Sequence, residues 1–302
     1  MSPSRRIDVS ANGLRQKLNL RIRHAVGLTQ DPPPMCNDPE LAYFPVDGVS
    51  RLVHGDLATM IIGGLGSLFL QMLHPHAMAG VAQHSRYQHD ATGRLLQTAN
   101  FIGHTTYGTK TAAYLDIERV LAVHEAVRGI ADDGQPYYAN DPHLLAWVHV
   151  CEALMFLDAY RAYGTIPLSA IDLDDYVLEM SRLAHDLGAE NPPTTYAQLR
   201  QQLEDFRPEL RLSKDGEVAR DFVIRGFVST PLQKFAHRRF VASSFLLMPE
   251  WARELLGVSV AGPFGRLAGG VTTKVLCDAT RFFVPPAVVE RGPRDSRDSL
   301  SA

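Results

Sequence analysis

The sequence predicts an all-α protein that forms a single multi-helix globular domain. Over most of residues 50–256, apolar side chains recur at three- and four-residue steps, which is the period of one helix face. Helix boundaries are marked as well, and Asp141 followed by Pro142 is typical of a helix start. No long run alternates apolar and polar residues. The best strand candidates are the short valine-rich runs 258–260 and 271–275.

The expected elements begin in residues 1–42, with a helix at 1–28 followed by a proline-rich connector. This helix is basic and amphipathic but lacks the apolar core of roughly 7–15 residues that a secretory signal needs. We expect it to pack on the domain, with docking to an anionic membrane surface as the minor alternative. The domain itself should occupy residues 43–257, followed by a packing segment at 258–289 and a disordered tail at 290–302.

Within the domain, the first long helix carries the apolar stretch MIIGGLGSLFLQML at residues 60–73. This stretch has 14 residues, fewer than the roughly 20 that a membrane-spanning helix needs. Its three glycines predict a buried helix in close contact with neighbouring backbone. In chain order, helices are expected at residues 50–73, 76–87, 91–107, 110–130, 141–163, 173–188, 195–206, 216–225, 231–246 and 249–256.

Composition narrows the class of function. Hydrophobic residues make up 45% of the chain and charged residues 21%, and the net charge of −3 gives no reason to expect nucleic acid as a partner. The three cysteines are far apart and form no CxxC pair, so neither a structural zinc site nor an iron–sulfur cluster is expected. A sparse, odd number of cysteines fits a reducing compartment. Because the sequence also contains no secretory signal, we expect a cytoplasmic location.

His124 is the first candidate functional residue. In LDIERVLAVHEAVRGI, residues 115–130, it falls on the same helical stripe as Ile117 and Val127, which should face the core. A buried imidazole must be hydrogen-bonded or ligated, because leaving it unpaired costs about 1–3 kcal/mol. Two interpretations follow: a core histidine bonded to a carbonyl or carboxylate, or the axial ligand of a haem iron.

Arg94 and Thr98 are the next candidates, on the preceding helix. They stand four residues apart and so share a face, with Gln97 beside them. His124 and Arg128 have the same spacing on the following helix. Taken alone, Arg94 and Thr98 would be solvated surface residues. Short connections favour antiparallel packing, however, and such packing would present Arg94, Thr98 and His124 to one buried cavity between the helices.

A competing set of residues would hold a non-haem metal. Such a centre needs two histidines and a carboxylate on one ion. The candidates are His124, His149 and Glu152, because His149 and Glu152 lie one turn apart on one helix, on a face shared with Leu145. His149 has two other interpretations, a structural core residue or a support for a haem pocket.

Five motifs stand in a spaced series over roughly residues 43–257. They are LQMLHPHAMAGVAQHS (70–85), GRLLQTANFIGHTTYGT (93–109), VLAVHEAVRG (120–129), DGQPYYANDPHLLAWVHV (133–150) and LMPEWARELLG (247–257). The series resembles the MpaB and latex-clearing protein family of haem-dependent oxygenases, which includes the rubber oxygenases. Five motifs in this order are specific, whereas no single one of them would be.

The resemblance implies a function and a site. In the rubber oxygenases, a histidine matching His124 ligates a b-type haem, and residues matching Arg94 and Thr98 lie close to that haem. The chain would then be a haem b-dependent oxygenase that uses dioxygen to oxidise a hydrophobic substrate, with isoprenoids as one candidate class. Arg94 and Thr98 would serve both cofactor binding and catalysis. The alternatives are a helical protein that binds haem or a lipid without turnover, and a non-haem metal oxygenase.

Two departures from the family pattern concern the substrate. Rubber oxygenases have a lysine directly before the threonine, where this chain has Gln97, so one positive charge is missing. They use a carboxylate base in the stretch that lies here between Asp56 and Asp90, and this stretch contains no Asp or Glu. It contains four histidines instead: His74, His76, His84 and His89. A histidine can act as a base, but cleavage of polyisoprene does not follow from the resemblance.

Overall fold

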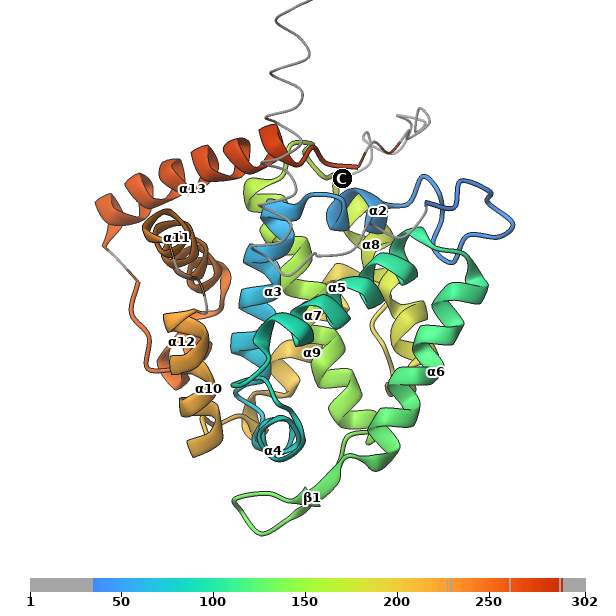
Figure 1. The fold of residues 1–302 in the computed structure, drawn as a ribbon, viewed down its shortest axis with the longest axis vertical. Coiled ribbons are helices and arrows are strands. Elements are labelled where there is room, and N and C mark those ends of the chain that lie inside the picture. The colour runs from blue at the N-terminus through green and yellow to red at the C-terminus, as the bar shows by residue number, and fades with distance from the viewer. Residues whose placement is uncertain (1–34, 227, 229, 261, 288, 290–302) are drawn as a thin grey trace, which may run out of the picture.

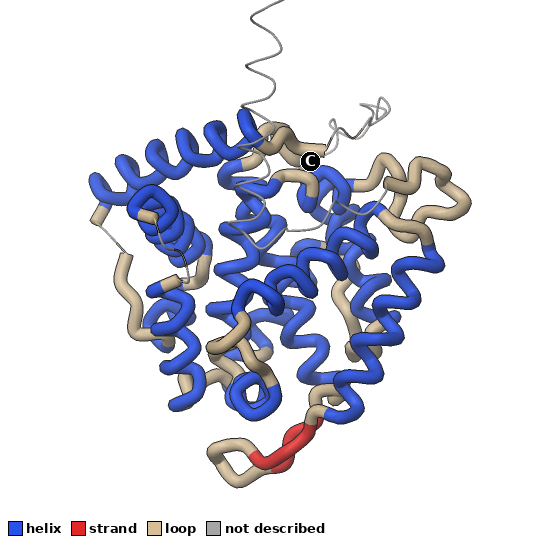
Figure 2. The backbone as a smooth tube through the Cα atoms, viewed as in Figure 1, coloured by secondary structure: helices blue, strands red, loops and turns tan. Residues whose placement is uncertain are grey.

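The structure, a computed structural model, describes residues 35–226, 228, 230–260, 262–287 and 289 (Figure 1). These residues form twelve α-helices, one 3-10 helix and one two-stranded sheet, so the predicted all-α class is confirmed (Figure 2). The helix expected at 1–28 and the tail expected at 290–302 lie outside the described residues. The division of the chain at residues 42, 257 and 289 stays a prediction.

The elements follow one another along the chain with short connections. They are α2 (Val49–His54), α3 (Leu57–Gln71), α4 (Pro75–His84), α5 (Ala91–Tyr107), α6 (Lys110–Ala126), β1 (Arg128–Ile130), β2 (Pro136–Tyr138), α7 (Pro142–Tyr163), α8 (Ala170–Asp186), α9 (Tyr196–Asp205), the 3-10 helix η1 (Arg207–Glu209), α10 (Lys214–Arg225), α11 (Pro231–Leu247), α12 (Glu250–Leu255) and α13 (Pro263–Phe283).

The centre of the fold is the helix pair α3 and α7, which lie side by side (Figure 1). Glycines on α3 let the two helices approach closely. A Cβ atom on Gly63 would lie 2.8 Å from the backbone oxygen of Met155, and a Cβ atom on Gly66 would overlap the end of the Met155 side chain. Helix α7 is buried along nearly its whole length. The prediction of a buried, glycine-rich helix in close backbone contact is therefore confirmed.

Asp56 divides the first expected helix into two. The sequence predicts one helix over residues 50–73, and this is wrong, because α2 ends at His54 and α3 begins at Leu57. The Asp56 carboxylate accepts hydrogen bonds from the first backbone N–H groups of α3, at 3.2 Å and 3.5 Å, and so acts as its N-cap. Among the described residues, no single helix is long and apolar enough to cross a membrane. Only the pair α3 and α4, bent by 105°, meets that test together.

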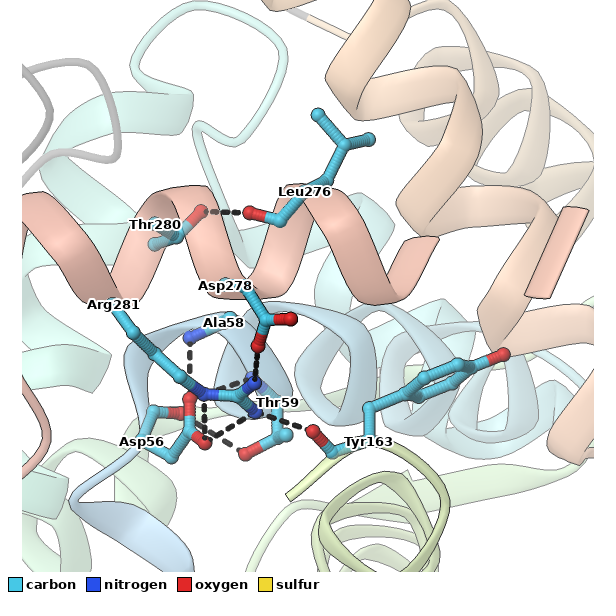
Figure 3. Close-up of polar contacts among 8 residues, drawn as sticks. All are labelled: Asp56, Ala58, Thr59, Tyr163, Leu276, Asp278, Thr280 and Arg281. Carbon is cyan, nitrogen blue, oxygen red and sulfur yellow. Dashed lines mark hydrogen bonds and ion pairs between the residues drawn. The ribbon is translucent and has the colours of Figure 1, made fainter. Parts of the chain in front are cut away.

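Helix α13 occupies the region where the sequence suggests strands. Residues 271–275 lie inside this helix and residues 258–260 are irregular, so both strand candidates are wrong. Valine-rich runs favour strands locally, but tertiary contacts override this preference. Arg281 pairs with the buried Asp56 at 2.7 Å and also donates to the backbone oxygen of Tyr163 (Figure 3). These contacts fix α13 to the start of α3 and the end of α7.

Helices α5 and α6 form a hairpin with a two-residue connection. Asp90 caps the start of α5 and Thr109 caps the start of α6 through side-chain oxygens. His104 of α5 pairs with Asp116 of α6 and joins the two helices near the connection. The hairpin is therefore held together at the end where the chain turns.

Helix α6 ends at Ala126, four residues short of its predicted end at residue 130. Val127 is extended, and the next residues pair as β1 with β2 in an antiparallel ribbon. Arg128 is thus in a strand and is not one helical turn from His124, which corrects the spacing expected for these two residues. The Ala139 N–H donates to the Val127 oxygen at 2.9 Å. The end of α6 therefore lies beside the residues that lead into α7.

Candidate functional site

His124 lies near the end of α6 on its inward side. It follows the buried Ile117 by seven residues, close to two full turns, so the two side chains share one side of the helix. The ring is half-buried, and its Nδ1 atom is buried without a hydrogen-bond partner among the described residues. Burial lowers the pKa of His124, and the positive charge of Arg94 lowers it further. The ring is therefore neutral at physiological pH, the form in which histidine binds metals.

Arg94 and Thr98 lie on the inward side of α5. They precede the buried Thr105 by eleven and seven residues, close to three and two full turns. Both are nevertheless exposed, and the Thr98 hydroxyl donates to the backbone oxygen of Arg94 at 3.1 Å. The expectation that they line a buried cavity is wrong in this respect. Inward-facing residues stay exposed only where the neighbouring elements leave room, and the space beside Arg94 and Thr98 is open.

The α5–α6 hairpin packs tightly only near its connection. Its buried residues all lie there: Thr105, Thr106, Ala113, Asp116 and Ile117. No residue of 91–104 or of 118–126 is buried. Arg94, Thr98 and His124, the inward-facing polar residues of these two loosely packed arms, are called the hairpin wall below.

Helix α7 has one incompletely covered stripe. Its members are Leu145, Val148, His149, Glu152 and Phe156. All other residues between positions 145 and 157 are at most 1% exposed, so neighbouring elements cover every other side of this part of the helix. The sequence places Leu145, His149 and Glu152 on one face, and the structure confirms that they share it. These five residues are called the α7 wall.

Two links connect the α7 wall to the α5–α6 hairpin. At one end, the ring of His54 in α2 contacts the ring of Phe156, with centroids 5.5 Å apart, and its Nδ1 lies 2.8 Å from the Thr106 hydroxyl of α5. At the other end, the hydrogen bond from Ala139 to Val127 holds the end of α6 beside the start of α7. Between these links, α5 packs on α6 and α2 rather than along α7. Both ends of the α7 wall are therefore tied to the α5–α6 hairpin, one end through α2 and the other through the residues that lead into α7.

The polar groups of the α7 wall are neutral or titrate near neutral pH. Burial lowers the pKa of His149 to about 4, and its Nε2 atom is buried with no hydrogen-bond partner in the described part of the chain. Burial raises the pKa of Glu152 to about 7, although a hydrogen bond with Gln71 of α3 favours the charged form. The positive charge of Arg94 lies near His124 on the hairpin. Residue spacing alone does not reveal the state of Glu152, because that state depends on burial.

The non-haem alternative lacks an assembled ligand set. Within the described ranges, no three His, Cys, Asp or Glu side chains lie close enough together to hold a metal ion, so His124, His149 and Glu152 do not form such a centre. A haem iron needs as few as one ligand from the protein. His74 directly precedes α4, and its side chain is buried.

The all-α fold thus carries a half-buried histidine with an exposed arginine near it on the hairpin, and a titratable carboxyl group on α7. The family model described as "ER-bound oxygenase mpaB/B'/Rubber oxygenase, catalytic domain" matches residues 51–282, and the chain belongs to this family. It is therefore an oxidoreductase of the oxygenase type, which acts on a small molecule and oxygen. The match includes nearly all of α13. No curated protein and no solved structure matches the chain.

Proposed function

We propose that the protein is a haem b-dependent oxygenase that uses dioxygen to oxidise a hydrophobic substrate of the isoprenoid type. Family membership supplies the class of reaction. The observation that carries the cofactor is the state of His124: a neutral imidazole on the inward side of α6, with a buried ring nitrogen that no described residue bonds.

The residues of the two walls fit a haem. His124 would ligate the haem iron through its imidazole, and Arg94 offers a cation of the kind that binds propionate carboxylates. Leu145, Val148 and Phe156 give the opposite wall an apolar surface for a flat, apolar ring system. The arms of α5 and α6 contain no buried residue, and we propose that the haem lies between these arms and α7. His124 would hold the iron, and Arg94 and Thr98 would border the cofactor.

Each residue then has a role in the reaction. Bound haem supplies the chemistry of oxygen activation. The Arg94 guanidinium would orient an anionic or oxygen-bearing group at the hairpin wall. The Thr98 hydroxyl adds a second polar group one turn away. The apolar side chains of the α7 wall exclude water from an apolar substrate.

The absorption spectrum and iron content of freshly purified protein test this proposal. We expect a Soret band and iron bound in proportion to haem, together with oxygen uptake when a reductant and an isoprenoid such as squalene are added. A colourless, iron-free protein would instead support the lipid-binding alternative. A haem-loaded protein that consumes no oxygen with any apolar substrate would support haem binding without turnover.

A further inference from the structure

In the α7 wall, the described residues leave the hydrogen bonding of two polar groups incomplete. His149 is 7% exposed, and its Nε2 atom has no hydrogen-bond partner in the described ranges. Glu152 lies one turn away on the same stripe. Among the described residues, its carboxyl group is hydrogen-bonded by the side chain of Gln71, which carries no charge. Burying a polar atom without a partner, as at His149 Nε2, costs stability, so such atoms are typical of sites where a ligand completes the hydrogen bonding.

The surroundings of this pair are otherwise apolar or uncharged. The stripe continues with Leu145, Val148 and Phe156. Glu152 acts on Cys151 and Tyr176, and burial raises the pKa of each well above its ordinary value, so both are neutral. Neither α3 nor α5 contains an Asp or Glu. The carboxyl group at this site is therefore that of Glu152 on α7, and α3 and α5 add none.

We propose that the site takes a substrate carrying one hydroxyl group on an apolar skeleton, and that His149 and Glu152 bind this hydroxyl. The inference rests on the proposed function, because it concerns the substrate of the same site. A hydroxyl group donates one hydrogen bond and accepts others, which matches an imidazole N–H beside a carboxyl oxygen. A pure hydrocarbon leaves the Nε2 atom of His149 unpaired and adds no partner to Glu152. A carboxylate, including a haem propionate, would face the negative charge of ionised Glu152, and Arg94 offers such an anion a better place on the hairpin wall.

The test compares geraniol, a ten-carbon isoprenoid alcohol, with myrcene, a ten-carbon isoprenoid hydrocarbon. Calorimetry on the protein as purified measures the dissociation constants of geraniol and myrcene. The ratio of the two constants is then compared between wild type and each variant, so that the different solubilities of the ligands cancel. His149→Phe keeps a planar ring and removes the nitrogens. We expect the preference for geraniol over myrcene to fall about tenfold in this variant, as for the loss of one buried hydrogen bond. His185→Phe, at an exposed histidine on α8, is the matched control and should keep the wild-type ratio.

A second variant guards against misfolding of the first. Glu152→Leu should lower the same ratio by a similar factor, and circular dichroism shows whether each variant remains helical. An unchanged ratio in both folded variants overturns the inference, and so does a wild type that binds neither ligand. Loss of haem from His149→Phe also overturns it, because His149 would then serve the cofactor. A wild type without haem whose ratio still falls in both variants refutes the proposed oxygenase function and leaves the hydroxyl site standing.

Discussion

Burial raises the pKa of Glu152, so the free energy of unfolding must depend on pH. Its pKa is raised from 4.5 to about 7, so between these values the folded protein binds more protons than the unfolded chain does. The free energy of unfolding therefore falls as pH rises through this window. Glu152→Gln removes the titration and keeps a polar side chain beside Gln71. As the pH rises from about 5 to about 8, we expect the stability of this variant relative to wild type to increase by roughly 2–3 kcal/mol.

Urea unfolding of both proteins across this pH range measures the difference directly. The difference should level off above the pKa of about 7, where Glu152 is fully ionised in the folded state. A difference that does not change with pH would mean that Glu152 is solvated.

Asp141 is a residue whose role follows from sequence alone. The pair Asp141–Pro142 predicts the start of α7, and the Asp141 carboxylate accepts from the His143 N–H at 2.9 Å. Asp141→Ala should cost about 0.5–2 kcal/mol in thermal or urea unfolding, whereas Asp141→Ser should keep most of the cap. Equal losses in both variants would show that the capping bond is not what stabilises this helix end. Caps are local, which is why the sequence predicts this one correctly.

At the scale of elements, the contact between α3 and α7 predicts different outcomes for neighbouring glycines. A Cβ on Gly63 meets backbone atoms of Met155 and Phe156 at 2.8 Å, which cannot move aside. On Gly64, the nearest atom is 3.7 Å away. Gly63→Ala should destabilise by about 1–3 kcal/mol through overpacking. Gly64→Ala should be neutral or stabilise by up to about 1 kcal/mol, because alanine favours helix. Urea unfolding distinguishes the two, and the reverse order would contradict the helix contact.

The attachment of α13 depends on one buried ion pair. The Asp56 side chain is 1% exposed and that of Arg281 is 9% exposed. Arg281→Met would leave the Asp56 carboxylate buried without its partner, and we expect a loss of about 3–5 kcal/mol. The double variant Asp56→Asn with Arg281→Met keeps an N-cap for α3 and removes the unpaired charge, so it should recover much of that loss. A double variant as unstable as the single one would contradict this account.

The elements that the sequence mispredicts are those fixed by distant contacts. Periodicity places α5 correctly, because its caps and its apolar face are local. It misses α13, because its valines favour a strand locally. The contact that fixes this helix joins Arg281 to Asp56, which lies 225 residues away along the chain. It also extends α6 too far, because the pairing of β1 with β2 cannot be read from helical spacing.

At the scale of the whole molecule, the sequence predicts which residues meet but not how open their site is. Helical spacing brings Arg94, Thr98 and His124 to the inward side of one hairpin, and it puts His149 and Glu152 on one stripe. The exposure of Arg94 and Thr98 follows from the way the hairpin packs, tightly at its connection and loosely along its arms. That packing depends on the contacts of α5 with α2, and no local pattern encodes it.

The haem content of purified wild type, His124→Ala and His149→Ala tests the central claim most directly. The account predicts about one haem per chain in wild type, loss of most haem in His124→Ala with its helices intact, and retention in His149→Ala, because one axial histidine holds the iron. The pyridine haemochrome spectrum measures the haem, and circular dichroism measures the helices. Haem retained in folded His124→Ala, or absent from wild type, would contradict the account and leave His124 as a structural residue.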